Sequence, residues 1–237
     1  MNAAVIVAAG KGVRLGGEIP KQFLKLKDKP VLVHTLQQFN QLEDLFSETV
    51  VVLPAGNLDY AREKIFKPFF QPYGMETGSI KLVEGSDERQ ASVRRGLSAL
   101  DPQVQNICIH DGVRPLVTPS LIKSVMQAGC LHGAATLAVP LKDTLKEVDG
   151  EGNVIKTLPR SRYRLIQTPQ CFKRELIEEA HLKAREQGSE ATDDASLVEL
   201  LGYSVKTVEG SGDNLKITTP EDLIMAEMLL EKRGRNV

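Results

Sequence analysis

A run of small residues near the start of the chain is the first feature that could do chemistry. Its members are Ala8, Ala9, Gly10 and Gly12. With side chains this small, backbone N–H groups can approach phosphate oxygens closely and form an anion-binding nest. Arg14 and Lys21 follow within a few residues and add positive charge. The combination predicts a loop that binds a phosphate chain, with a plain strand-to-helix turn as the alternative.

Two other phosphate-binding motifs do not match this loop. The dinucleotide-binding fingerprint needs a small residue where Leu15 stands and an acidic residue after the second strand, where Leu53 and Pro54 stand. A P-loop needs Gly-Lys-Ser or Gly-Lys-Thr after four spacer residues, whereas Gly17 is followed by a glutamate. A dinucleotide-dependent oxidoreductase is therefore the least favoured class of enzyme.

Further stretches of the chain narrow the interpretation. They are Pro20-Lys21-Gln22, Gly85-Ser86-Asp87-Glu88-Arg89-Gln90-Ala91-Ser92-Val93, His110-Asp111-Gly112-Val113-Arg114-Pro115, Thr168-Pro169-Gln170-Cys171-Phe172 and Asp213-Asn214-Leu215-Lys216-Ile217-Thr218-Thr219-Pro220-Glu221-Asp222. In order and over essentially the whole chain, they resemble the 2-C-methyl-D-erythritol 4-phosphate cytidylyltransferase family, whose members are nucleotidyltransferases of the sugar- and polyol-phosphate type.

The resemblance implies a reaction of the non-mevalonate isoprenoid pathway. CMP would pass from CTP to 2-C-methyl-D-erythritol 4-phosphate, with release of pyrophosphate and formation of 4-diphosphocytidyl-2-C-methyl-D-erythritol. The same chemistry on ribitol 5-phosphate is the alternative, but the sequence of residues 141–166 and Thr192-Asp193-Asp194-Ala195-Ser196 look more like the former. A nucleotide-binding regulatory module without catalysis is a further alternative, which the presence of both Arg14 and Lys21 disfavours.

The resemblance also implies roles for residues at matching positions. Arg14 and Lys21 match the family's stabilisers of the pentacoordinate α-phosphate. Arg160 and Lys216 match the residues that position the attacking phosphate. The residues that match CTP contacts are Ala8, Ala9, Gly10, Gly12, Gly85, Asp87, Arg89 and Ser92. Those that match contacts to the polyol phosphate are Asp111, Arg114, Thr144, Arg160, Thr168, Thr192 and Lys216.

Nucleotidyl transfer requires neutralisation of charge rather than a general base. The attacking phosphate is already ionised, so no proton has to be removed and no catalytic histidine or serine is expected. Asp111 ends a predicted strand and Asp213 precedes another, and these two carboxylates are the predicted ligands of Mg²⁺, or another divalent cation, on the triphosphate. Asp213 stands in Gly-Asp-Asn, which is also suited to a turn.

The elements that must position these residues alternate between strand and helix. Strands are predicted at residues 3–9, 49–53, 80–83, 107–109, 134–139, 203–208 and 214–217. Helices are predicted from residue 30, over 58–69 and 93–100, from 118, over 175–186 and 192–201, and from 219. This order predicts one α/β domain over residues 1–237, with a doubly wound, mostly parallel sheet of the Rossmann-like nucleotidyltransferase type. Ligands of such sheets bind at the carboxyl ends of the strands.

Residues 141–166 break the alternation. Strand patterns at 144–148 and 154–158 flank the turn sequence Asp149-Gly150-Glu151-Gly152-Asn153 and predict a protruding β-hairpin arm. An isolated hairpin is only marginally stable in water, so the arm is predicted to pack on a second subunit and form a homodimer. Because Thr144 and Arg160 flank the arm, one subunit could complete the site of the other. A flexible surface hairpin is the alternative.

The composition narrows the partners and the setting. The 237 residues carry a formal net charge of −1, so no global basic field attracts nucleic acid or an anionic membrane. No apolar run reaches the ~20 residues that a membrane span needs. The three cysteines, Cys108, Cys130 and Cys171, form neither a disulfide framework nor a metal knuckle. A soluble, reducing, cytoplasmic setting is expected.

Overall fold

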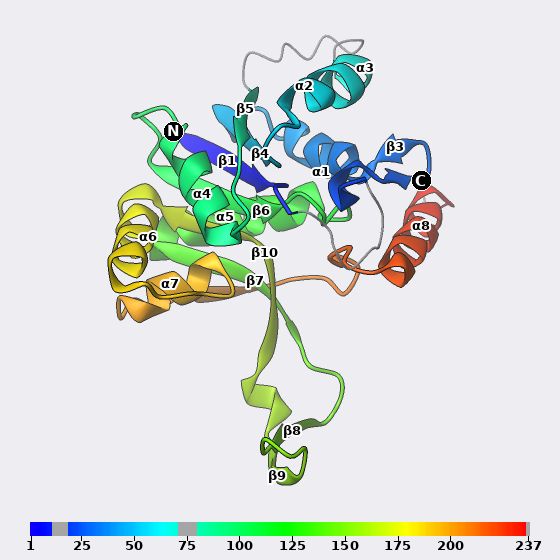
Figure 1. Ribbon diagram of the computed structural model, residues 1–237. Coiled ribbons are helices and arrows are strands. Elements are labelled where there is room, and N and C mark those ends of the chain that lie inside the picture. The colour runs from blue at the N-terminus through cyan, green and yellow to red at the C-terminus, as the bar shows by residue number, and fades with distance from the viewer. Residues whose placement is uncertain (11–18, 71–79, 236–237) are drawn as a thin grey trace.

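Seven strands form the central sheet of the computed structural model, which describes residues 1–10, 19–70 and 80–235 (Figure 1). Their order across the sheet is β11-β7-β10-β6-β1-β4-β5. Their bounds are β1 Asn2–Val7, β4 Glu48–Leu53, β5 Ile80–Glu84, β6 Asn106–Asp111, β7 Ala134–Pro140, β10 Arg164–Lys173 and β11 Lys206–Glu209. Neighbouring strands are parallel except at β10, which is antiparallel to β6 and β7. The predicted α/β fold with a mostly parallel sheet is confirmed.

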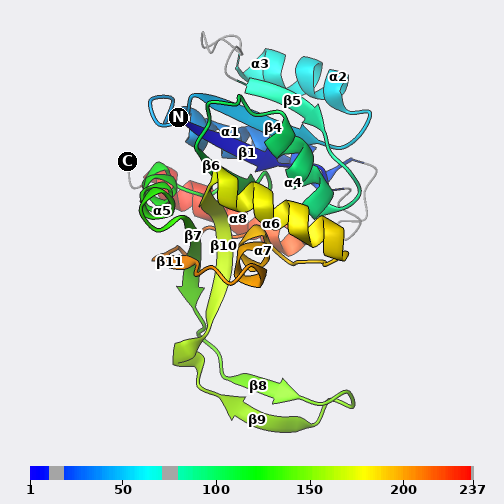
Figure 2. The same ribbon diagram turned by 90° about the vertical axis from the view of Figure 1, so that its left-hand side faces the viewer.

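Helices cover both faces of the sheet (Figure 2). Their bounds are α1 Val31–Asn40, α2 Leu58–Ala61, α3 Lys67–Phe69, α4 Arg89–Ser98, α5 Pro119–His132, α6 Arg174–Gln187, α7 Asp194–Leu200 and α8 Pro220–Arg235. Short helical turns are η2 Lys21–Phe23, η3 Arg62–Phe66 and η6 Arg160–Arg162, and a small hairpin pairs β2 Lys25–Leu26 with β3 Lys29–Pro30. Helices α4, α6 and α7 lie on one face, and α1 and α5 lie on the other.

Strand β1 contributes to the cores on both faces. Its side chains alternate, so Ala4 and Ile6 pack with residues of α1 and α5, while Val5 and Val7 pack with residues of α4 and α6. All four are at most 9 % exposed. Burial on both faces explains why the sequence of this strand is continuously apolar rather than alternating.

Part of the strand prediction is wrong. Residues 214–217 form no strand. Isolated hydrogen bonds to different segments hold them, rather than the continuous hydrogen-bond ladder of a β-sheet. The side-chain N–H of Asn214 donates to the carbonyl of Thr168 at 2.9 Å, and the backbone N–H of Ile217 donates to the carbonyl of Val113 at 2.9 Å. Strand β10 is missed by the sequence patterns, since Pro169 interrupts the run. The ladder between β10 and β7 shifts register between Ile166 and Gln170, and this irregularity accommodates the proline.

The predicted hairpin arm is present and projects away from the sheet (Figures 1 and 2). β8 Leu145–Val148 and β9 Val154–Leu158 pair antiparallel and lie between β7 and β10 in the chain. The carboxylate of Asp149 closes the turn by accepting the backbone N–H groups of Glu151 at 3.0 Å and Asn153 at 2.8 Å. In the described ranges, none of the helices has both the length and the apolar character required to cross a membrane.

Candidate active site

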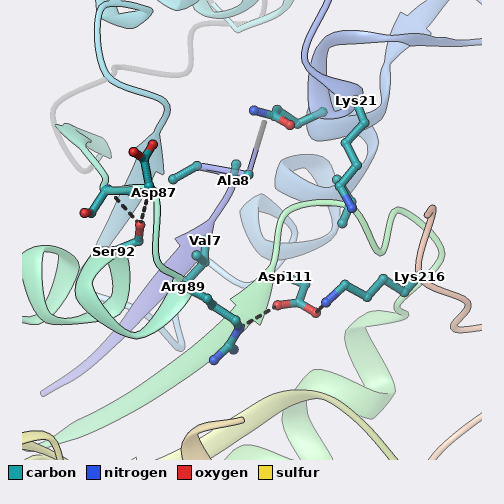
Figure 3. Close-up of a pocket in the computed structure, with 13 residues that line it drawn as sticks. Val7, Ala8, Lys21, Asp87, Arg89, Ser92, Asp111 and Lys216 are labelled. Carbon is teal, nitrogen blue, oxygen red and sulfur yellow. Dashed lines mark hydrogen bonds and ion pairs between the residues drawn. The ribbon is translucent and has the colours of Figure 1, made fainter. Parts of the chain in front are cut away.

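A cleft of about 260 Å³ lies at the carboxyl edge of the sheet (Figure 3). The described residues that line it are Val7, Ala8, Ala9, Gly10, Lys21, Gln22, Ser86, Asp87, Arg89, Ser92, Asp111, Val113 and Lys216. Backbone hydrogen bonds hold the loops beyond the strands together. The N–H of Ala8 donates to Val52 and that of Gly112 donates to Val7, both at 2.8 Å. We refer to this space as the first cleft.

Most of the residues predicted to contact CTP border the first cleft. They are Ala8, Ala9, Gly10, Asp87, Arg89 and Ser92. Gly85 lies beside it, where a Cβ atom would stand 2.3 Å from the Cβ of Ala9, so only glycine fits. The hydroxyl of Ser92 accepts from the N–H of Ser86 at 2.9 Å and donates to its carbonyl at 3.0 Å, which fixes the loop. Gly12 and Arg14 lie outside the described residues.

Asp111, on the lining of the first cleft, forms ion pairs with three cationic side chains. Its carboxylate lies 2.8 Å from Nζ of Lys216, 3.4 Å from Nε of Arg89 and 3.7 Å from Nε of Arg114. Figure 3 shows Arg89 and Lys216 approaching it from opposite sides. Burial alone would raise the pKa of Asp111, but the charges of Arg89, Lys216 and Arg114 hold that pKa below its usual value. The carboxylate is therefore ionised and organises the cationic groups.

Arg89 is held from its other end by a second buried carboxylate. Its Nη2 lies 2.8 Å from Asp194, whose other oxygen lies 3.1 Å from Nε2 of His181. Burial would lower the pKa of Arg89, but Asp194 and Asp111 together raise it. Gln170 fixes Asp194 by accepting its backbone N–H at 3.1 Å. Sequence reasoning missed Asp194 and His181, because an acid in the first turn of a helix is also typical of an exposed position.

A second cleft of about 420 Å³ adjoins the first. The described residues that line it are Arg89, Asp111, Arg114, Ile166, Gln167, Thr168, Gln170, Thr192, Asp193, Ser196, Glu199 and Lys216. Arg89, Asp111 and Lys216 line both clefts and form the wall between them. Of the residues predicted to contact the polyol phosphate, this cleft brings together Asp111, Arg114, Thr168, Thr192 and Lys216.

Besides Gly85, three predicted site residues lie apart from these described linings. Thr144 and Arg160 are exposed at the base of the arm, where the Arg160 guanidinium donates to the carbonyl of Lys142. Asp213 lies 3.9 Å from Nη2 of Arg233, and its side chain is half exposed. These roles remain predictions, and the metal-ligand role of Asp213 gains no support from this position.

His110 links the two strands that carry Asp111 and Thr168. Its Nε2 lies 3.3 Å from the carbonyl of Arg114, which can only accept, so Nε2 carries the proton. The Nδ1 of the neutral ring then accepts from the hydroxyl of Thr168 at 3.0 Å. The same hydroxyl accepts the backbone N–H of Asp111 at 3.0 Å. The neutral imidazole thus fixes Thr168, and through it the backbone that carries Asp111.

We expect His110 to make the protein sensitive to mild acid. Burial lowers its pKa from 6.5 to about 3, so between these values the unfolded chain binds a proton that the folded protein excludes. The contribution to stability is complete above pH 6.5 and declines toward pH 3, by up to about 1.4 kcal/mol per pH unit. The pKa of the Asp111 carboxyl is lowered from 3.8, so the stability that this carboxylate contributes is lost only as the pH falls below that value. Urea unfolding between pH 7.5 and about 4.5 measures the slope.

His110→Gln is the matched control for this prediction. Glutamine keeps a donor and an acceptor but does not titrate. The free energy of unfolding of the variant should therefore depend less steeply on pH, because unfolding takes up about one proton fewer than in the wild type. Equal slopes in the two proteins would show that His110 does not cause the acid sensitivity.

Sequence comparison shows similarity along nearly the whole chain. A family model for 2-C-methyl-D-erythritol 4-phosphate cytidylyltransferase matches residues 2–232. The protein of that name from Desulforamulus reducens is 46 % identical over 231 residues, which cover 98 % of this chain and 96 % of the relative. The one from Caldanaerobacter subterraneus subsp. tengcongensis is 42 % identical over 232 residues, covering 97 % and 99 %.

Solved structures show the same similarity. The crystal structure of 4-diphosphocytidyl-2C-methyl-D-erythritol synthase from Anaerococcus prevotii superposes with a TM-score of 0.84 at 32 % identity, covering 97 % of this chain and 98 % of the other. The crystal structure of 2-C-methyl-D-erythritol 4-phosphate cytidylyltransferase from Thermus thermophilus gives a TM-score of 0.77 at 37 % identity, also covering 97 % and 98 %.

Proposed function

The chain belongs to the 2-C-methyl-D-erythritol 4-phosphate cytidylyltransferase family, and on that premise we propose that it transfers CMP from CTP to 2-C-methyl-D-erythritol 4-phosphate. The products are pyrophosphate and 4-diphosphocytidyl-2-C-methyl-D-erythritol. The observation that carries the proposal is the shared wall of Arg89, Asp111 and Lys216 between two adjoining clefts. Two anionic substrates that react with each other need adjacent sites with cations between them. We also propose that residues 1–237 form a single nucleotidyltransferase domain.

The geometry supports a mechanism based on charge and position. CTP would occupy the first cleft, and the acceptor phosphate would occupy the second and approach the α-phosphorus past Lys216. Lys21 donates from Nζ to the carbonyl of Ile217 at 3.2 Å, so its ammonium group lies beside the segment that carries Lys216. Lys21 and Arg14 would neutralise the charge that develops on the α-phosphate. Lys216 and Arg160 would position the ionised acceptor phosphate, which needs no general base.

We propose that Mg²⁺, or another divalent cation, accompanies the triphosphate and that Asp111 holds it. Magnesium in nucleotide sites takes one or two carboxylates and several phosphate or water oxygens, and the described lining of the first cleft offers the carboxylates of Asp111 and Asp87. No group of three potential ligands from histidine, cysteine, aspartate and glutamate exists in the part of the chain that the structure describes. This fits a cation that arrives with the nucleotide. Such an ion would neutralise charge on the triphosphate oxygens.

We also propose that the arm forms a homodimer. Val148, Val154 and Ile155 of the arm are 52 %, 59 % and 57 % exposed, which is unusual for apolar side chains clustered on a small hairpin. The position of Thr144 and Arg160 beside the arm supports a site shared between subunits. The free thiols of Cys108, Cys130 and Cys171 fit the proposed cytoplasmic setting.

A coupled pyrophosphate-release assay with two acceptors tests the function. With CTP and the divalent cation present, we expect 2-C-methyl-D-erythritol 4-phosphate to give a kcat/KM at least roughly 100-fold above that of ribitol 5-phosphate, since a site built around one set of hydroxyls rejects another. Reactions without acceptor provide the background rate.

Two outcomes would contradict this proposal. Equal or faster turnover of ribitol 5-phosphate would favour the other polyol. Binding of CTP without pyrophosphate release on either acceptor would favour a regulatory nucleotide-binding module.

A further inference from the structure

Gln22 has a buried side-chain amide that no described residue pairs with. The side chain is 0 % exposed and borders the first cleft, yet neither Nε2 nor Oε1 has a hydrogen-bond partner within the described ranges. An amide offers two N–H donors and an acceptor oxygen, and leaving all of them unpaired in the interior destabilises a fold. Such a group in a native protein requires an explanation.

The turn that carries Gln22 is fixed on both sides. Lys21 donates to the carbonyl of Ile217 at 3.2 Å, and Phe23 is buried in the core with its ring 5.1 Å from that of Tyr60. The backbone N–H of Phe23 donates to the carbonyl of Pro20 at 2.8 Å. Because its neighbours are anchored, the backbone of Gln22 is held at the edge of the first cleft, which its side chain borders.

The chemistry of the first cleft indicates what the amide would bind. The small residues Ala8, Ala9 and Gly10 and the charge of Lys21 make this side of the cleft suitable for phosphate. Phosphate oxygens only accept hydrogen bonds, so they complement the N–H donors of Gln22. We propose that Gln22 is a further nucleotide-binding residue, whose amide nitrogen donates to the phosphate chain of CTP. The proposal rests on the proposed function, because it requires CTP in the first cleft.

The variant Gln22→Met tests the proposal, since methionine has similar length and volume but no donor. The melting temperature of the nucleotide-free protein should rise by about 2–4 °C, because the substitution removes a buried amide that has no partner among the described residues. The dissociation constant for CTP, measured by calorimetry with the divalent cation present, should rise roughly tenfold, because one hydrogen bond to phosphate is lost. A gain in stability with a loss of affinity is not the signature of a purely structural residue.

Gln170→Met is the matched control for stability. Gln170 is also 0 % exposed, but its Nε2 donates to Asp193 at 2.7 Å and its Oε1 accepts from the N–H of Ala195 at 3.0 Å. The same substitution should therefore lower the melting temperature there, because it leaves buried partners unpaired.

Other outcomes separate the rival explanations. If an internal water bridges the amide of Gln22, Gln22→Met would lower the melting temperature and leave CTP affinity unchanged, which would overturn the proposal. Unchanged CTP affinity with any melting temperature would also overturn it. Failure of the wild type to bind CTP would overturn the proposed function itself, and this measurement distinguishes the two failures.

Discussion

Lys21→Ala is expected to lower the rate of CMP transfer by roughly 10²–10³-fold while CTP still binds. The ammonium group of Lys21 borders the first cleft, where the Ile217 carbonyl accepts from it at 3.2 Å. A positive charge held at this point stabilises the α-phosphate most when negative charge develops on it in the transition state. Interactions that strengthen only there act on kcat rather than on substrate binding. Single-turnover kinetics and CTP calorimetry measure the two effects separately.

Two further substitutions sharpen the interpretation. Lys21→Arg keeps the charge but changes its shape and reach, so it should recover part of the lost rate. Lys25→Ala, at an exposed lysine on β2, removes one positive charge away from the residues that line the clefts and should leave the rate unchanged. If Lys21→Ala transferred CMP as fast as the wild type while CTP bound, the catalytic assignment of Lys21 would be wrong.

Local sequence patterns predict the parts of the fold that depend on local physics. The apolar run of β1 predicts a strand buried on both faces, and its side chains alternate between two cores. The turn of the arm is predictable because Asp149 caps it within four residues. The same patterns do not predict β10, because a proline such as Pro169 is not typical of the interior of a sheet. The strand accommodates it through a shift in register with β7.

The sequence likewise predicts some residues of the candidate site and misses the contacts that hold them in place. Resemblance identifies residues that border the clefts, such as Asp87 and Lys216, because they stand in motifs of fixed spacing. The pairs that organise them come from distant segments, as in the contacts of Arg89 with Asp194 and of Asp194 with His181. No periodicity encodes such pairs. The amide of Gln22, which has no partner among the described residues, is visible only once packing has closed around it.

Deleting residues 146–157 should convert the proposed homodimer into a monomer. Leu145 and Leu158 are cross-strand partners, so the Cα atoms that the deletion joins lie only about 4.5–5.5 Å apart. The mass in solution, measured by light scattering, should fall from twice the chain mass of 26.0 kDa to roughly one chain mass. Ile155→Asp, which keeps the hairpin but charges its exposed apolar surface, should shift the equilibrium the same way.

Leu131→Asp on α5 is the control for Ile155→Asp. Leu131 is 77 % exposed and lies away from the arm, so a charge there should leave the mass unchanged. A deletion variant that kept the mass of the wild type would mean that the arm does not hold the subunits together.

The deletion leaves both Thr144 and Arg160 in the chain, so its effect on CMP transfer tests whether the site is shared. If Arg160 acts in the partner's site, the monomer should lose most of its activity although every predicted site residue is present. Mixing refolded Arg160→Ala and Lys21→Ala chains then decides the point. A shared site predicts that about one quarter of sites regain both residues, because half of the dimers are mixed and each has one intact site. A site built within one chain predicts no recovery, since every site would then lack one of the two residues.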